Sequence, residues 1–259
     1  QNTIGDGLEN SSAQEGLVAL STRPGFTTRF DLRAGATRFD PGPLGETWTS
    51  ATGFARFRWA ARDRGPSIEL NGQRVPLGTT PALVLSRAVR TEGRLLAEVP
   101  LGPIRLRGEG RRGTIAALGE TNQRWSLDGA LVFPLGWWGE LSLQGHRLRY
   151  DDSSTAGYFA ADKVETVEAG SYLELGDGAP WLAALDLGAG GQRIQRFGEA
   201  PGDWKLAARA WGWITYSLGA GRALQLEIEG YNAPGAAAAV ATSPAWRHGS
   251  MSLSIKWGL

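Results

Sequence analysis

Apolar and polar residues alternate along most of this chain with a period of two. From Met251 to Leu259 every second residue is apolar, and Ser252, Ser254 and Lys256 lie between them. In a β-strand this period places the two sets of side chains on opposite faces. We therefore predict a strand at 245–259 with one apolar and one polar face.

The same alternation recurs upstream, and the polar partner is very often charged. Ala55, Phe57 and Trp59, for example, alternate with Arg56 and Arg58. No segment reads as a helix that would cover the apolar faces. Lipid outside and water inside a closed sheet account for both faces at once. The predicted fold is therefore all-β, a transmembrane up-and-down antiparallel β-barrel.

We predict about fourteen strands, with twelve or sixteen as alternatives, at 16–23, 25–37, 51–63, 66–75, 81–90, 92–101, 103–115, 121–134, 136–151, 163–176, 180–196, 203–219, 222–232 and 245–259. Over the second half, short turns alternate with longer connections, as periplasmic turns and extracellular loops do in outer-membrane barrels. The long connection 38–50 falls on the side where short turns are expected. Residues 1–15 are polar and predict an N-terminal extension, with 16–259 as a single barrel domain.

Composition narrows the class of protein. The chain has 259 residues, is 42% apolar and has no run of 18 apolar residues, which excludes a helical membrane protein but not a barrel. The 37 Gly and 11 Trp suit many tight turns and aromatic girdles. Cys is absent, which excludes disulfides and Cys-ligated metals. We predict no metal site, no cofactor and no nucleic-acid partner, and the start at Gln1 suggests a processed N-terminus.

Charge is unevenly distributed along the chain. Residues 1–120 hold 16 of the 27 basic residues and 12 of the 26 acidic ones, so the first half is net positive and the remainder net negative. Two interpretations stay open: a transverse field that orients permeating solutes, or salt bridges that fill and rigidify the interior. The predicted pore-lining residues are Arg29, Arg33, Arg56, Arg58, Arg105, Arg107, Glu140, Glu168, Asp186, Glu227, Glu229 and Lys256.

Most Trp residues are expected in the interfacial girdles. Alternation nevertheless turns four aromatic residues inward, beside the acidic strands: Trp138, Tyr172, Trp211 and Trp213. The apolar faces of sugar rings stack on such aromatic faces, while carboxylates bind the hydroxyls. These four residues are candidates for saccharide stacking.

An enzymatic function has little support in the sequence. His248 and Ser250 share one face of the last strand, an arrangement found in lipid-modifying outer-membrane enzymes. A catalytic triad also needs a third member, which the sequence does not assign. We predict no catalytic residue, and we interpret His146 as a residue of the lumen or rim.

Two resemblances sharpen the expectation. The last strand, with an aromatic residue two positions before Leu259, resembles the closing strand of bacterial outer-membrane barrels, although that family usually ends on Phe. Residues 121–259 resemble the C-terminal barrel of exopolysaccharide-secretion proteins of the cellulose-export type. The matching features are Gly157-Tyr158-Phe159, Trp181, Gly188, Gly190, Gly191, Gln192, Trp204 and Tyr216-Ser217-Leu218. Family members commonly have a Pro after the aromatic pair, where this chain has Ala160 and Ala161.

The resemblance implies a polysaccharide conduit in the outer membrane. Family members carry long N-terminal tetratricopeptide arrays, which this sequence lacks, so the resemblance implies either a periplasmic repeat protein or another assembly partner as a separate chain, or a trimmed chain. The expected function is an outer-membrane pore for a polysaccharide or other polar solute, with outer-membrane lipid around it. Alternatives are a general diffusion porin, a structural or anchoring barrel and, less favoured, a lipid-modifying barrel enzyme.

Overall fold

The computed structural model describes residues 12–61, 65–78, 80–176, 180–219, 221–232 and 248–257. They form one antiparallel sheet in which thirteen strands follow in chain order, each paired with the next. The strands are β1 (Ser12–Thr22), β2 (Thr28–Asp40), β3 (Trp48–Ala60), β4 (Ser67–Pro76), β5 (Val89–Leu101), β6 (Ile104–Ala117), β7 (Glu120–Pro134), β8 (Gly139–Tyr150), β9 (Lys163–Leu175), β10 (Trp181–Gln195), β11 (Lys205–Gly219), β12 (Arg222–Tyr231) and β13 (His248–Trp257). The predicted all-β, up-and-down antiparallel architecture is confirmed. Within the described residues, β1 and β13 are the two edges.

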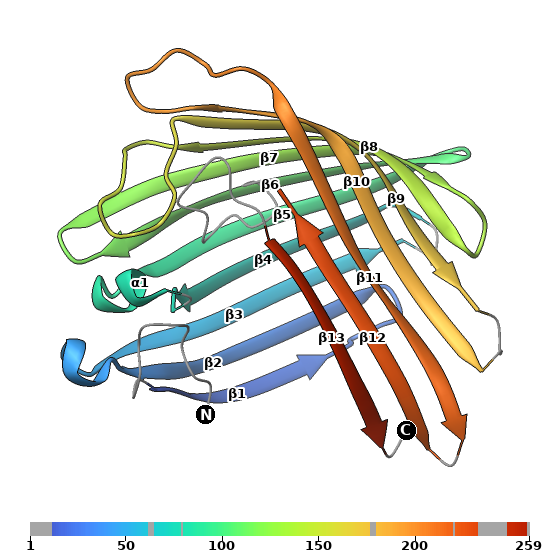
Figure 1. Ribbon diagram of the computed structural model, residues 1–259, viewed down its shortest axis with the longest axis horizontal. Helices are drawn as coiled ribbons and strands as arrows, with labels where there is room; N and C mark the ends of the chain where they lie inside the picture. The colour runs from blue at the N-terminus through green and yellow to red at the C-terminus, as the bar shows by residue number, and fades with distance from the viewer. Residues whose placement is uncertain are drawn as a thin grey trace.

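The sheet is strongly curled, and β10–β13 cross the view at a steep angle to β1–β4 (Figure 1). Arg105 of β6 binds Glu140 of β8, and Arg209 of β11 binds Glu168 of β9. Each pair reaches over an intervening strand, and curvature towards this face brings such side chains closer together. We call this concave, charged face the inner face.

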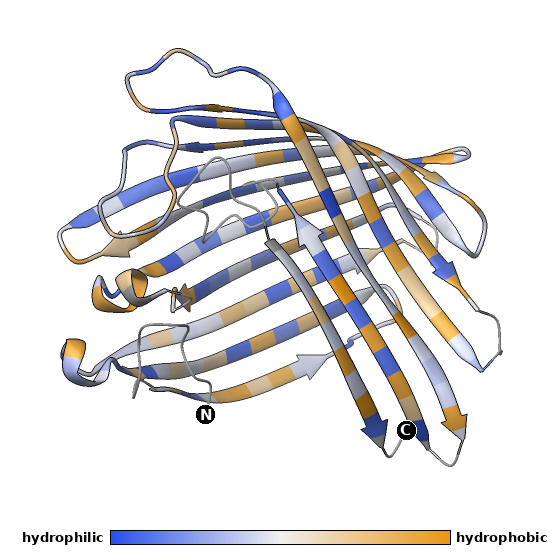
Figure 2. Ribbon diagram, viewed as in Figure 1, coloured by the Kyte–Doolittle hydropathy of each residue, from blue (hydrophilic) through white to orange (hydrophobic). Residues whose placement is uncertain are grey.

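The opposite, outer face is apolar. Figure 2 shows apolar and polar residues alternating in bands along the strands. Large apolar side chains lie exposed on the outer face, including Leu127 at 59% and Leu143 at 50%, while Glu109 and Glu168 on the inner face are buried. A water-soluble sheet would hide the apolar face and expose the charged one. This sheet does the reverse.

One predicted strand is wrong. Residues 81–90 contain the helix α1 (Pro81–Leu85) and a turn, and β5 begins only at Val89. Thr80 is the N-cap of α1, where its Oγ1 accepts a hydrogen bond from the Leu83 backbone N–H at 3.3 Å. The Thr-Pro pair at 80–81 is a common helix start and outweighs the apolar run that follows it. The described residues therefore hold thirteen strands instead of about fourteen.

Removing that strand also explains the misplaced connection. The link 41–47, which contains the 3-10 helix η1 (Gly42–Leu44), now lies at the same end of the sheet as the other long connections. We call this end the long-loop end; its connections are 41–47, 77–88, 118–119, 151–162, 196–204 and 232–247. The opposite, short-turn end has the connections 23–27, 61–66, 102–103, 135–138, 176–180 and 220–221. Only 118–119 departs from the division into long and short.

The N-terminal boundary also differs from the prediction. β1 begins at Ser12, so residues 12–15 belong to the sheet and not to an extension. Glu15 pairs with Thr37 of β2 in the regular register. Residues 1–11 of the predicted extension lie outside the described residues.

An apolar core occupies the long-loop end, and α1 is its centre. Leu83 and Val84 are fully buried. Leu83 packs in one cluster with Leu148 and Tyr158, and Val84 packs in another that contains the stacked rings of Phe39 and Trp48. The short helix therefore joins the β2–β3 wall to the β6–β9 wall. We call α1 and the packed connection 151–162 the cap.

The cap should be a measurable source of stability. Leu83→Ala removes a fully buried side chain and should lower the free energy of unfolding by about 2 to 5 kcal/mol. Leu85→Ala, on the same helix but 38% exposed, is the matched control and should cost about 1 kcal/mol or less. Urea titration of the folded protein in lipid would measure both. Equal costs would contradict a packed cap.

Candidate functional site: the charged inner wall

The register places the predicted lining residues on the inner face of eight strands. They lie on β2 and β3 (Arg29, Arg33, Arg56, Arg58), β6 (Arg105, Arg107), β8 (Glu140), β9 (Glu168), β10 (Asp186), β12 (Glu227, Glu229) and β13 (Lys256). Residues paired across neighbouring strands share a face. Arg58, for example, lies opposite Arg29 on one side and opposite Glu69 on the other.

Ion pairs on this wall are local. Asp31 accepts hydrogen bonds from Arg29 and Arg56, with Arg56 Nη2 at 2.6 Å, and Glu98 binds both Arg105 and Arg107. The partners lie on the same strand, on neighbouring strands or on strands two apart. The sequence analysis left open a basic wall that pairs with an acidic wall. The ion pairs of the described residues instead form short chains along one continuous surface.

Among the predicted lining residues, three cations and two anions keep no ion pair within the described part of the chain: Arg33, Arg58 and Lys256, and Glu227 and Glu229. Arg33 and Arg58 are on β2 and β3, and Glu227 and Glu229 are on β12. Glu227 accepts one hydrogen bond, from Trp211 Nε1 at 3.2 Å. The unpaired charges of the predicted set therefore lie close to the two edges of the sheet: positive on β2 and β3, beside β1, negative on β12, and positive again on β13.

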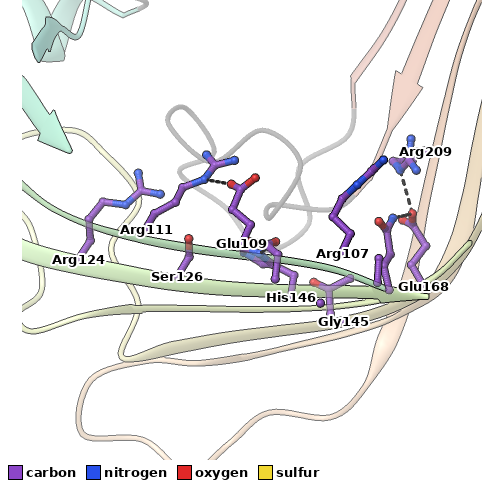
Figure 3. A pocket seen from close by; sticks show the side chains of 14 residues that line it. Arg107, Glu109, Arg111, Arg124, Ser126, Gly145, His146, Glu168 and Arg209 are labelled. Carbon is purple, nitrogen blue, oxygen red and sulfur yellow. Dashed lines mark hydrogen bonds and ion pairs between the residues drawn. The ribbon is translucent and has the colours of Figure 1, made fainter. Parts of the chain in front are cut away.

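A cavity of about 360 Å³ opens on the inner face between β6 and β11. Figure 3 shows its lining side chains pointing into one space. They include Arg107, Glu109, Arg111, Arg124, His146, Glu168 and Arg209. The cavity combines cations and carboxylates, which suits a polar solute with both donor and acceptor groups.

The most deeply buried carboxylate in this cavity wall is held by two partners. Glu168 is 5% exposed, and its Oε1 accepts a hydrogen bond from Arg209 Nε at 2.8 Å. Gln144 Nε2 donates a second hydrogen bond to the same carboxylate. Arg209 also binds Asp186, so it links β9 and β10 to β11. Arg209, Glu168 and Asp186 therefore hold β9, β10 and β11 together on the inner face.

A row of alternating acids and aromatic rings crosses five strands. Glu140, Tyr172, Asp186, Trp211 and Glu229 are consecutive partners in the register from β8 to β12. We call them the aromatic-acid row. Glu140 lies beside the short-turn end and Glu229 beside the long-loop end. Because strands in a curled sheet are tilted, a row perpendicular to them climbs along the axis.

The polar atoms of the two rings are bound, and their faces are left for contact. Tyr172 donates its hydroxyl to Glu174 Oε1 at 2.6 Å, and Trp211 donates Nε1 to Glu227. Trp213 lies on the same face, opposite Glu227. Trp138 does not belong to a strand; it lies in the 135–138 turn and is 40% exposed. Three of the four stacking candidates therefore share one part of the inner face.

The two histidines lie in different parts of the sheet, His146 on β8 in the cavity and His248 at the start of β13. His146 faces the cavity, where its Nδ1 lies 2.5 Å from Asp128 Oδ1, and no hydroxyl among the described residues binds its Nε2. His248 opens β13, and Ser250 lies opposite Glu229 on the inner face. Within the described ranges, no group of three or more His, Asp or Glu could hold a metal ion.

Some inner-wall residues escaped the sequence analysis. Arg209 and Arg124 are absent from the predicted set, although their neighbours Trp211 and Ser126 share their face. Strict alternation continued from Trp211 would have found Arg209. The pairing of Arg124 with Glu92 of β5, at 3.5 Å, reaches over β6 and needs the curvature of the sheet.

No protein-family model matches the chain, and no curated protein matches it. No helix among the described residues is long and apolar enough to span a bilayer. The functional interpretation therefore depends on the geometry of the sheet.

The Arg209–Glu168 pair should show strong coupling. Arg209→Met leaves a buried carboxylate without its cation and should destabilise the fold by about 3 to 5 kcal/mol. Adding Glu168→Gln should recover most of that loss. Arg149→Met, which breaks a half-exposed pair with Asp162, should cost about 1 kcal/mol or less. A double-mutant cycle by urea unfolding measures the coupling, and additive effects would disprove it.

Proposed function

We propose that this protein is a transmembrane β-barrel of the bacterial outer membrane that forms a path for a polar solute, with a polysaccharide as its cargo. The observation that carries the proposal is the reversed distribution of polarity: apolar residues such as Leu143 are exposed outside, and charges such as Glu168 are buried inside. Lipid around the sheet and water within it satisfy both faces. The division into long loops and short turns supports the same placement.

A barrel in lipid must close, because unpaired backbone groups are too costly in hydrocarbon. β1 and β13 both run from the long-loop end to the short-turn end, so their seam would be parallel. A parallel seam is how a barrel with an odd number of strands closes. Glu227 and Glu229 on β12 would attract Arg33 and Arg58 on β2 and β3 across this seam, and Lys256 on β13 would oppose part of that attraction.

Cysteine cross-linking would test the closure, because the natural chain has no Cys. Val18→Cys in β1 should form a disulfide, in lipid, with at least one of Met251→Cys, Leu253→Cys and Ile255→Cys in β13. Val18→Cys with Leu143→Cys, on distant β8, is the control that should not cross-link. A gel shift within the monomer is the expected result. Cross-links only between two chains would overturn single-chain closure.

The aromatic-acid row favours a saccharide as cargo. Strands lie roughly 4.8 Å apart, so Tyr172 and Trp211, two strands apart, are separated by about 10 Å. That spacing is comparable to two rings of an extended sugar chain. Rings can stack on the apolar faces of sugars while Glu140, Asp186 and Glu229 accept hydrogen bonds from hydroxyls. Several weak contacts in sequence let a polymer slide, whereas one tight site would hold it.

A second candidate function has an observation of its own. The cap buries Leu83 and Val84 between two walls at the long-loop end. A barrel closed there would act as a structural or anchoring element of an outer-membrane assembly. For the export function, the partner that we propose is a periplasmic repeat protein, as the family resemblance implies.

Single-channel recording separates the candidates and tests the cargo. We expect conductance in planar bilayers and blockade of the current by oligosaccharides. The duration of each blockade should increase with the length of the oligosaccharide. Trp211→Ala should weaken the blockade by about 2- to 10-fold through the loss of one stacking contact. Trp59→Ala, a Trp on the outer face, is the matched control and should leave the blockade unchanged.

The outcomes point to different functions. Ion conductance without blockade by any glycan would favour a general diffusion porin. Absence of conductance in the natural protein, with conductance in Leu83→Ala, would favour a barrel closed by its cap. Absence of conductance in both would overturn the pore.

A further inference from the structure

The outer face changes character towards the long-loop end. On β8 the outward residues are Leu141, Leu143, Gly145, Arg147 and Arg149 in that order. The outward residues of β6 and β10 change in the same order. On β6 they run from Leu106 through Gly110 to Arg112, and on β10 from Leu187 through Gly191 to Arg193. The apolar band therefore ends on alternate strands, β6, β8 and β10, in glycines followed by arginines. We call Arg112, Arg147, Arg149 and Arg193 the outer arginine cluster.

The register brings the cluster together around two tryptophans. Trp125 of β7 lies between Arg112 and Arg149, and Arg147 lies over its ring at 5.6 Å. Arg193 lies over the ring of Trp204 at 5.1 Å. Tryptophan rings mark the level at which a membrane protein meets the headgroups. The arginines thus stand where the hydrocarbon ends.

Positive charge exceeds negative charge here. Arg149 pairs with Asp162 at 3.0 Å, and Arg193 and Lys163 share Glu165. Arg112 and Arg147 are exposed and have no ion-pair partner in the described part of the chain. An outward arginine within hydrocarbon would cost about 2 to 4 kcal/mol, so these side chains require polar surroundings. Their unpaired positive charge favours an anionic partner.

We infer that the outer arginine cluster binds the phosphate groups of a phosphorylated glycolipid in the outer leaflet. Guanidinium groups bind phosphate oxygens in bidentate geometry, which Arg112 and Arg147 are free to supply. The acyl chains of the same lipid would lie on exposed Leu127, Leu143 and Val167, on the neighbouring apolar band. The inference rests on the proposed function, because it places the long-loop end at the outer leaflet.

The test uses the full chain in lipid nanodiscs, with bisphosphorylated lipid A as the probe. Native mass spectrometry should show retained lipid A, and Arg112→Gln/Arg147→Gln should weaken its binding by about 10-fold or more. Arg222→Gln removes an exposed, outward arginine at the opposite, short-turn end and should change nothing. Dephosphorylated lipid A should bind the natural protein as weakly as bisphosphorylated lipid A binds the double variant.

Each outcome is decisive. Equal retention by the natural protein and the double variant would overturn the site, as would full displacement of lipid A by millimolar inorganic phosphate, which would mark a free-anion site. Membrane insertion is measured separately, by protease protection in phosphatidylcholine vesicles. Failure to insert would overturn the proposed outer-membrane function, whereas insertion without any preference for phosphorylated lipid would overturn the outer arginine cluster alone.

Discussion

Short-range ion pairing on the inner face is the interaction on which the rest of this structure depends. A sheet that exposes its apolar side must gather its charges on the other side, where curvature brings them close together. Arg209 between Glu168 and Asp186, and Asp31 between Arg29 and Arg56, meet this condition by pairing over distances of one or two strands. A carboxylate as buried as Glu168 would be strongly unfavourable without its cation. Pairing therefore permits the curl, and the curl makes pairs such as Arg105–Glu140 possible.

Periodicity was sufficient to predict the faces of the strands but not their neighbours. The alternation of Arg56 and Arg58 with Phe57 and Trp59 assigns inward and outward sides without any knowledge of pairing. The aromatic-acid row, by contrast, depends on register across five strands, and single strands contain no register information. Glu140 and Glu229 are far apart in sequence, and only the pairing places them on one path.

The error at 81–90 has a local physical cause. Ala82, Leu83, Val84 and Leu85 form an apolar run, which a short strand and a buried helix share equally. The Thr80 cap, and burial of Leu83 and Val84 against opposite walls, decide for the helix. Tertiary packing of that kind cannot be read from periodicity. Periodicity does, by contrast, predict the outer arginine cluster, because Arg147 and Arg149 continue the outward series of Leu141 and Leu143.

The long-loop end of the sheet combines two features, the cap on the inner face and the outer arginine cluster on the outer face. At the long-loop end, the cap packs on the inner face while Arg112 and Arg147 face outward. If a lipid phosphate holds these arginines, it also fixes β6 and β8, whose inner residues Ile115 and Leu148 belong to the cluster around Leu83. Lipid outside and cap inside would then act on the same strands. A change at the lipid phosphate would then be transmitted to the cap through the thickness of one strand, because the side chains of each strand alternate between the two faces.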